Sequence, residues 1–229
     1  MIFIATLAIG EDFKKKLAPA LKSKEAYAKR NGYTYLQADE AVWDRTRPIA
    51  WSKVGFVNSI LSRVPDGTII WLSDADVLIT NPLLRLEDHV LPLLPSDKDI
   101  LLTMDACGHL NSGNMILRAS KWTRDFWLRV DSQTDCTYHI WWENAAIIKL
   151  MESSNTDREK IEVTAEHTRF NAYLQGLPEQ PLWKPGDFLI HFAGIYDLNR
   201  MERLIRDIQG GKIPRLDMMD PNKITYLSI

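Results

Sequence analysis

Short continuous apolar runs alternate along the chain with longer segments in which apolar residues recur at helical spacing. Apolar runs of this length are typical of strands that are buried on both faces of a sheet. We expect strands at residues 2–6, 33–36, 68–72, 100–104, 115–117, 161–164 and 188–192. Because helical segments separate most of these runs, the pattern predicts an α/β fold with a mostly parallel central sheet flanked by helices.

The helical segments are defined by their apolar spacing and by residues that favour helix ends. We expect helices at residues 13–31, 50–63, 120–130, 142–151 and 198–208. Pro19 predicts a start or a bend within the first of them, and Ser120 is a candidate N-cap. No internal repeat, low-complexity segment or linker interrupts the pattern, so we expect a single domain over residues 1–229.

The charge balance argues against a nucleic-acid partner. The chain has 28 Lys plus Arg against 30 Asp plus Glu, a formal net charge of −2, which removes the electrostatic drive for nonspecific binding to polyanions. The basic residues of the first helical segment are Lys14, Lys15, Lys16, Lys22, Lys24, Lys29 and Arg30. We expect them to form a solvated helix face.

The N-terminal apolar residues fit a buried strand better than a targeting signal. Residues 1–9 have no basic segment before them, as a signal peptide would. No stretch of the chain approaches the ~20 apolar residues that a membrane-spanning helix needs. Cys107 and Cys136 form neither a C-x-x-C pair nor a disulfide framework, so a reducing compartment is the simpler assumption. We therefore expect a cytoplasmic or otherwise soluble protein with no membrane segment in this chain.

Two aspartates directly follow the strand expected at residues 68–72. Asp74 and Asp76 are two residues apart, so both carboxylates point to the same side while the backbone stays extended. Close carboxylates repel unless a cation lies between them, and oxygen ligands suit Mg²⁺ or Mn²⁺. Ligands of such sheets bind at the carboxyl ends of the strands. The pattern therefore favours a divalent metal site over the alternative that both aspartates only cap the turn before Asn81 and Pro82.

A second apolar strand, at residues 188–192, ends in a histidine. Taken alone, His191 would more often be a core or turn residue. Beside two carboxylates, however, an imidazole ligand would favour Mn²⁺ over Mg²⁺. The combination makes His191 the third candidate ligand.

The ordered motifs of the chain resemble glycosyltransferase family 34, the galactosyl/xylosyltransferase family, which has a GT-A fold. The resemblance covers about residues 2–196 and rests on the segments 51–53, 70–82, 110–118, 120–122 and 191–194. It implies a retaining, metal-dependent transfer of a hexose or pentose from a UDP- or GDP-sugar to an acceptor glycan or glycoprotein. It also implies Mn²⁺ as the cofactor, with Mg²⁺ as a possible substitute.

The resemblance further implies a role for each matched residue near the nucleotide. Asp76 and His191 would ligate the metal, and Asp74 would bind the metal or the ribose and diphosphate of the donor. The first strand, ending near Thr6, would hold the base, and Lys53 would reach the nucleotide or its phosphates. Residues 1 to about 105 would then form a nucleotide- and metal-binding half of the domain.

The remaining matched residues would form a half for the donor sugar and the acceptor, from about residue 106 to residue 229. Gly194, in the loop after the histidine, would contact the donor. Glu143 and Asn144 fall where the family carries an acidic residue followed by Gln, and either could stabilise an oxocarbenium-like sugar. The donor-sugar pocket would be lined by Asn111, Ser112, Gly113 and Asn114.

The chain also departs from the family pattern. Ile195 and Tyr196 stand where the family has Cys-Lys, so a phosphate-clamping lysine is missing and Arg200 is the nearest substitute in sequence. Beside the expected site, sugar rings could stack on the aromatic side chains of Trp51, Trp141 or Trp142, although packing in the core is the safer explanation for any one of them.

Two other classes of function compete with the glycosyltransferase hypothesis. A haloacid-dehalogenase-like phosphatase would use Asp74 and Asp76 as its D-x-D-x-[TV] motif and Thr103 as its second motif. The chain has no convincing lysine-containing third motif or closing acidic pair for that class, and the class leaves His191 unexplained. A non-catalytic domain that binds a nucleotide sugar or a carbohydrate is the other alternative.

Overall fold

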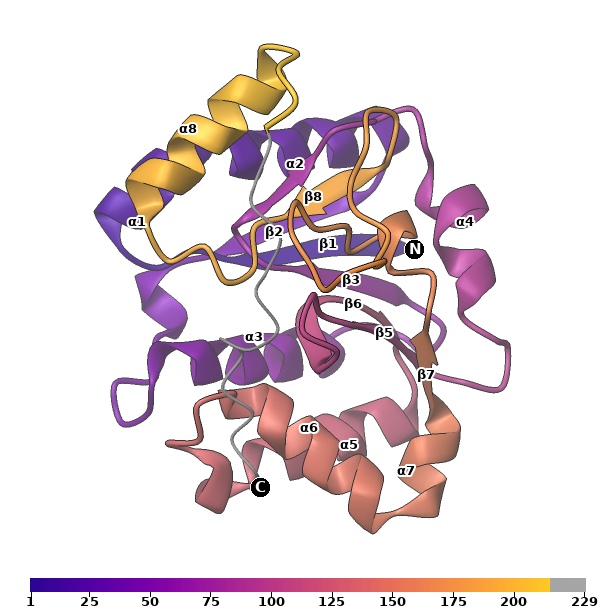
Figure 1. Cartoon of the computed structure of the whole chain (residues 1–229). Helices are drawn as coiled ribbons and strands as arrows, with labels where there is room; N and C mark the ends of the chain where they lie inside the picture. Colours follow the sequence, from indigo (N-terminus) through magenta and orange to yellow (C-terminus); the bar gives the residue numbers. More distant parts are fainter. Residues whose placement is uncertain (215–229) are drawn as a thin grey trace.

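A six-stranded sheet forms the centre of the computed structural model, which describes residues 1–214 (Figure 1). The strand order is β2-β1-β3-β6-β5-β7. The strands are β1 (Ile2–Leu7), β2 (Thr34–Ala38), β3 (Ile69–Ser73), β5 (Ile100–Met104), β6 (Leu110–Arg118) and β7 (Ile161–Thr164). Residues 215–229 of the expected single domain lie outside the described residues.

Five of the six strands run in the same direction. β1 is parallel to β2 and to β3, and β7 is parallel to β5, whereas β6 is antiparallel to both β3 and β5. The predicted α/β fold with a mostly parallel sheet is therefore confirmed. The reversed strand, β6, is longer than the strand predicted at residues 115–117, because its pairing with β3 begins at Asn114, opposite Ser73, and its first residues pair with β5, with Leu110 opposite Met104.

One layer of helices covers the sheet face that contains Leu72 and Leu117. Its helices are α3 (Ser52–Leu61), α5 (Lys121–Asp131), α6 (Trp142–Ser153) and α7 (Asn155–Lys160). Ser120 caps α5 as predicted, because its Oγ accepts a hydrogen bond from the backbone N–H of Thr123 at 3.0 Å. Trp51 is fully buried in this layer and donates its indole N–H to the carbonyl of Thr137. Trp51 is therefore a core residue and not a sugar-stacking one.

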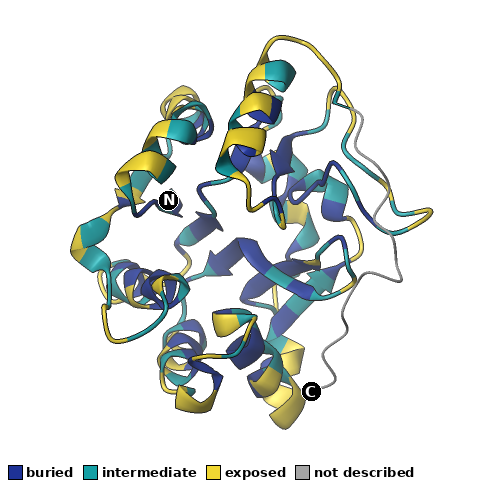
Figure 2. Cartoon of the chain, turned by 60° about the vertical axis from the view of Figure 1, so that its left-hand side comes forward, coloured by how far each residue is buried: buried dark blue, intermediate teal, exposed yellow. Residues whose placement is uncertain are grey.

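The opposite layer contains α1 (Glu11–Lys16), α2 (Ala18–Asn31), α4 (Leu86–His89) and α8 (Leu198–Gln209). Pro19 lies in the first turn of α2, where its missing N–H costs no helical hydrogen bond, so the predicted start at this residue is correct. The prediction that all the basic residues of this segment are solvated is wrong for Lys24, which is fully buried. Figure 2 shows the sheet dark blue between helices whose outer faces are exposed.

Two short strands form a second, two-stranded sheet, and the apolar pattern predicted only the later of the two, at residues 188–192. β4 (Val77–Ile79) is antiparallel to β8 (Leu189–His191), with Val77 opposite His191. Short 3-10 helices complete the described elements, at Glu40–Val42, Ile49–Trp51, Leu91–Leu93, Thr134–Cys136 and His167–Arg169. Because β4 follows β3 directly, this small sheet brings the end of β8 to the end of the central strand.

Candidate functional site

Asp74, Asp76 and His191 come together where the two sheets meet. The backbone N–H of Phe192 donates to the carbonyl of Asp76 at 3.1 Å, so the end of β8 lies against the turn between β3 and β4. The Nε2 atom of His191 lies 3.5 Å from Oδ1 of Asp76. One ligand atom from each of the three side chains lies within 4.8 Å of the other two. Two carboxylate oxygens and one imidazole nitrogen at this spacing fit a divalent cation such as Mn²⁺.

The two aspartates differ in their electrostatic surroundings. Burial raises the pKa of Asp74 above its ordinary value, against the opposing charge of Lys53. Burial also acts upward on Asp76, but the imidazole of His191 and the ammonium of Lys24 outweigh it and hold the pKa of Asp76 below its ordinary value. Asp76 is therefore the better prepared of the two to remain a carboxylate ligand.

Lys53 joins Asp74 to Glu143, and the lysine and Glu143 are 90 residues apart in sequence. Its Nζ lies 2.8 Å from Oδ1 of Asp74 and 3.0 Å from Oε1 of Glu143. Burial alone would lower the pKa of Lys53, but the charges of the two carboxylates outweigh it and raise the pKa above its ordinary value. The lysine thus holds the two acidic groups of the site in fixed positions.

Glu143 is held at one oxygen only. Its Oε1 accepts hydrogen bonds from Lys53 and from the hydroxyl of Ser112, the latter at 2.8 Å. Its Oε2 is buried and has no hydrogen-bond partner among the described residues. Asn144, the other predicted catalytic residue, accepts the backbone N–H of Ser112 at 2.8 Å with its amide oxygen. Of the two predicted catalytic residues, Glu143 is therefore the one with a side-chain oxygen that accepts no hydrogen bond from the described residues.

The segment predicted to line the donor-sugar pocket lies within β6. The carbonyl of Gly113 accepts a hydrogen bond from the backbone N–H of Asp74 at 2.7 Å, which joins this segment to the turn between β3 and β4. Asn111, Ser112 and Gly113 line a cleft, whereas Asn114 is fully buried. The amide of Asn114 is bonded within the core and does not face the cleft.

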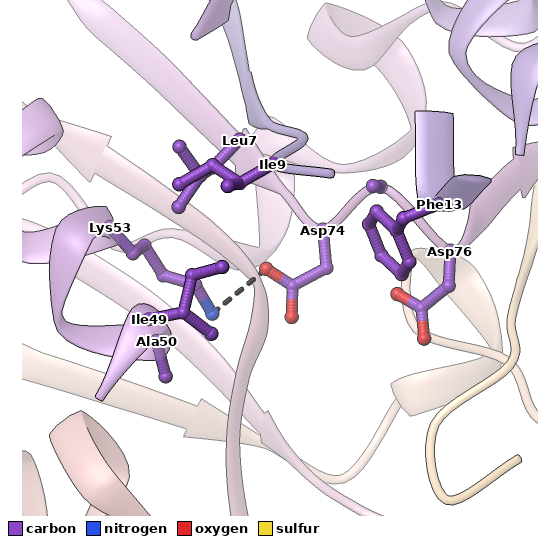
Figure 3. Close-up of a pocket in the computed structure, with 9 residues that line it drawn as sticks. Leu7, Ile9, Phe13, Ile49, Ala50, Lys53, Asp74 and Asp76 are labelled. Carbon is purple, nitrogen blue, oxygen red and sulfur yellow. Dashed lines mark ion pairs between the residues drawn. The ribbon is translucent and has the colours of Figure 1, made fainter. Parts of the chain in front are cut away.

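The candidate site is a cleft with an apolar and a polar part, which share Ala50, Lys53, Asp74 and Asp76. The apolar part, of about 350 Å³, is lined in addition by Leu7, Ile9, Phe13, Ile49 and Ala75. Figure 3 shows Leu7, Ile9 and Ile49 near the Lys53–Asp74 ion pair, and Phe13 beside Asp76. The polar part, of about 240 Å³, is lined in addition by Asn111, Ser112, Gly113, Trp142, Glu143, Asn144, His191, Ala193, Gly194 and Tyr196. The two aspartates stand at the boundary between the parts.

Some predicted residues do not reach this cleft. Thr6 is fully buried, and its hydroxyl donates to the carbonyl of Ser73 at 2.9 Å; the next residue, Leu7, lines the apolar part instead. Arg200 is exposed on α8 and does not line either part. Trp141 lines a neighbouring cavity beside His109, and only Trp142 of the three tryptophans faces the cleft.

Several residues of the site were not predicted from the sequence. Ile9 and Phe13 could have been found, because they follow the first strand at the edge of the sheet where ligands bind. Asn171 bonds to His191, but it lies in a loop without any recognisable motif.

The chain has the GT-A fold, which it shares with solved glycosyltransferases. A glycosyltransferase involved in the glycosylation of the major capsid of PBCV-1 matches with a TM-score of 0.69 at 11% identity, over 90% of this chain and 98% of that one. The galactosyltransferase LgtC, solved with donor and acceptor sugar analogs, matches with a TM-score of 0.53 at 15% identity, over 94% of this chain and 98% of that one.

The resemblance of the motifs to one glycosyltransferase family is confirmed. Residues 4–96 match the model of the galactosyl transferase GMA12/MNN10 family. A Schizosaccharomyces pombe protein named "Uncharacterized alpha-1,2-galactosyltransferase" is 24% identical, over 90% of this chain and 64% of its own length. The Saccharomyces cerevisiae protein named "Probable alpha-1,6-mannosyltransferase MNN10" is 24% identical, over 76% of this chain and 54% of its own length. The chain thus spans between half and two thirds of the length of these relatives.

Among the helices of residues 1–214, none has both the length and the apolar character needed to cross a membrane.

Proposed function

We propose that this chain is a metal-dependent, retaining glycosyltransferase. It moves a hexose or pentose from a UDP- or GDP-sugar to an acceptor glycan or glycoprotein, with Mn²⁺ as the preferred cation and Mg²⁺ as a substitute. The observation that carries the proposal is the cleft, in which two aspartates separate an apolar part from a polar part. The chemical groups of a nucleotide sugar follow the same order along the molecule: an apolar base, a charged diphosphate and a hydroxyl-rich sugar. The family match and the names of the relatives support glycosyl transfer.

Each part of the donor has a matching part of the cleft. The side chains of Leu7, Ile9 and Phe13 offer an apolar surface to the base. Asp74, Asp76 and His191 would hold the cation, which when bound neutralises the charge that develops on the leaving diphosphate. We therefore propose that residues 1 to about 105 bind the nucleotide and, together with His191, the metal.

The sugar then lies in the polar part of the cleft. Glu143 is pinned there by Lys53 and Ser112 at Oε1, which leaves Oε2 to face positive charge that develops at the anomeric carbon. Asn144 fixes α6 against β6 by accepting a hydrogen bond from the N–H of Ser112. Trp142 and Tyr196, which are 41% and 91% exposed, form the open side where an acceptor can approach.

The phosphatase alternative finds no support in the geometry. Thr103, which that mechanism needs at the site, is fully buried, and its hydroxyl accepts a hydrogen bond from the Asn171 amide at 2.7 Å. Asp74, the nucleophile of that mechanism, is ion-paired with Lys53.

The test is a thermal-shift screen of the 229-residue chain with nucleoside diphosphates and nucleotide sugars, each with and without Mn²⁺. A ligand that binds only the folded state raises the melting temperature, so we expect one donor to stabilise the protein in Mn²⁺ and to be hydrolysed slowly. Asp76→Asn should abolish both effects. Asp125→Asn, which breaks only an exposed ion pair with Lys121 on α5, is the matched control.

Three outcomes would count against the proposal. No stabilisation by any nucleoside diphosphate with Mn²⁺ would refute the nucleotide-sugar site. Binding without hydrolysis or transfer would favour the non-catalytic module. Release of phosphate from an aryl phosphate, lost in Asp74→Asn, would favour the phosphatase.

A further inference from the structure

Asn171 contacts His191 at Nδ1, the ring nitrogen that does not face Asp76. It is fully buried, and its Oδ1 lies 2.8 Å from Nδ1 of His191. The backbone N–H of His191 donates to the neighbouring carbonyl of Ala172, also at 2.8 Å, so the two segments are fixed against each other. Which group donates in the Asn171–His191 bond depends on how the Asn171 amide is oriented, and two separate contacts determine that orientation.

The first contact, with Asn114, is the end of a chain of hydrogen bonds that begins at Trp71, whose indole nitrogen can only donate. It donates to Oδ1 of Asn114 at 3.0 Å, so Asn114 must turn its NH₂ group the other way. That NH₂ group donates to Asn171 at 3.1 Å. Asn171 therefore presents its oxygen on this side, which is also the side of His191.

The second contact starts from the backbone N–H of Gly113, which is likewise only a donor. It donates to Oδ1 of Asn111 at 2.9 Å, so Asn111 presents an oxygen to its neighbours. The NH₂ group of Asn171 donates to that oxygen at 3.1 Å and to the hydroxyl of Thr103 at 2.7 Å. Both contacts thus require the same orientation of the Asn171 amide, with its oxygen toward His191.

We propose that Asn171 is a positioning residue that fixes the tautomer and direction of the His191 imidazole for metal binding. Because the Asn171 oxygen can only accept, Nδ1 of His191 carries the proton, and the lone pair of Nε2 points toward Asp76, 3.5 Å away. A metal-ligating histidine commonly donates its other N–H to a carboxylate, a carbonyl or a water. Here an amide oxygen takes that place, without adding a third negative charge beside the two aspartates.

The inference rests on the proposed metal site but can be tested apart from it. In the metal-free, ¹⁵N-labelled chain at a pH where the imidazole is neutral, the ring nitrogens of His191 should report a protonated Nδ1 and an unprotonated Nε2. A His191 imidazole protonated at Nε2 would overturn the inference, whether or not the protein binds a metal.

Direct Mn²⁺ titration, followed by calorimetry or by the loss of the free Mn²⁺ paramagnetic signal, tests the consequence. Asn171→Leu keeps the shape of the side chain but removes the acceptor, and we expect it to bind Mn²⁺ roughly 10–100-fold more weakly than wild type. Asn171→Asp keeps an oxygen opposite Nδ1 but loses the NH₂ donor to Asn111 and Thr103, so it should bind Mn²⁺ more tightly than Asn171→Leu and more weakly than wild type. Asn58→Leu, on α3 and away from the cleft, is the matched control and should bind as wild type does.

The outcomes separate the two proposals. Wild-type affinity in a folded Asn171→Leu variant would overturn the role of Asn171. If Asn171→Leu does not fold, the tautomer measured in the wild-type protein decides the question. Failure of the wild-type chain to bind Mn²⁺, with the Nδ1–H tautomer present, would refute the metal site while leaving the positioning of His191 intact.

Discussion

A Cβ atom at position 113 would lie 2.3 Å from Cε1 of His191 and 2.9 Å from its Nε2. His191 cannot retreat easily, because it is 4% exposed and its Nδ1 is bonded to Asn171. We therefore expect Gly113→Ala to push the imidazole out of place and to remove most of the Mn²⁺ affinity. Overpacking of this kind typically costs ~1–3 kcal/mol of unfolding free energy. Mn²⁺ titration and urea unfolding of the same preparation measure both effects.

Gly55→Ala is the control for the glycine substitution. Gly55 is exposed in α3, and a Cβ atom there would meet nothing within 4 Å. Because alanine favours a helix interior over glycine, this variant should gain about 0.5–1 kcal/mol and bind Mn²⁺ as wild type does. Unchanged Mn²⁺ affinity in Gly113→Ala would show that the imidazole tolerates the displacement.

Lys53→Met should destabilise the protein, because it leaves Asp74 and Glu143 without their shared cation. Removing one member of a buried ion pair costs roughly 3–5 kcal/mol, and we expect the lower end because the Asp74 side chain is 32% exposed. Burial already raises the pKa of Asp74, and Lys53 opposes that shift. A carboxyl group whose pKa is raised in the folded state makes the protein less stable as the pH rises from the unfolded pKa of the group to its folded pKa. The free energy of unfolding of Lys53→Met should therefore fall further below that of wild type at pH 8 than at pH 4.5.

Urea unfolding at the two pH values measures this deficit. Lys53→Arg keeps the charge and should lose much less stability at both. A deficit in Lys53→Met that stays constant with pH would mean that lost packing, and not the uncompensated carboxylates, accounts for it.

Trp142 should be dispensable for folding but needed at the site. Its backbone φ is 41°, which costs an L-residue ~1–2 kcal/mol, and its side chain is 41% exposed beside Glu143. Trp142→Gly relieves that backbone cost, so the melting temperature should stay the same or rise while donor hydrolysis and transfer to an acceptor fall. A large loss of stability, with activity retained in the folded fraction, would assign the residue to packing instead.

Most strands of the large sheet were predictable because they contain a short run rich in apolar or β-branched residues, and 100–104 and 161–164 match to the residue. Of the small sheet, β8 was predicted at residues 188–192, but β4 was not, because a three-residue strand such as Val77–Ile79 directly after the two aspartates cannot be distinguished from the end of a turn. That sheet nevertheless sets the register that places His191 beside Asp76. The three candidate metal ligands were found from residue type and position, whereas the reason for their proximity was not.

Contacts between distant residues were the part of the site that spacing could not reveal. Lys53 and Glu143 were each singled out, but nothing in the sequence indicated that they pair with each other. Asn171 carried no signal, because its role depends on hydrogen bonds to residues 20 to 68 positions away. Lys24 was predicted to be solvated because lysines are almost never fully buried, whereas this lysine is.

The buried Lys24 should make the stability of the metal-free protein depend on pH. Its Nζ donates to the carbonyl of Ala75 at 3.2 Å, and burial lowers its pKa to about 7 despite the charges of Asp76 and Asp74. Below pH 7 both the folded and the unfolded chain hold the proton, so the fold bears the full cost of burying the charge. Between pH 7 and the ordinary value of 10.5 the unfolded chain binds more protons, so the free energy of unfolding rises with pH, by up to ~1.4 kcal/mol per unit.

Lys24→Met lacks this group and isolates its contribution. In chelator-treated protein, the variant should be more stable than wild type at pH 6.5, and the difference should shrink steadily toward pH 9.5 as Lys24 of the wild type becomes neutral. Lys22→Met, on the same helix but exposed, should show no such pH-dependent difference. Comparing urea unfolding of the three proteins at each pH cancels the titration of the other groups. A constant difference between Lys24→Met and wild type over this range would mean that the buried amine keeps its proton in the folded state.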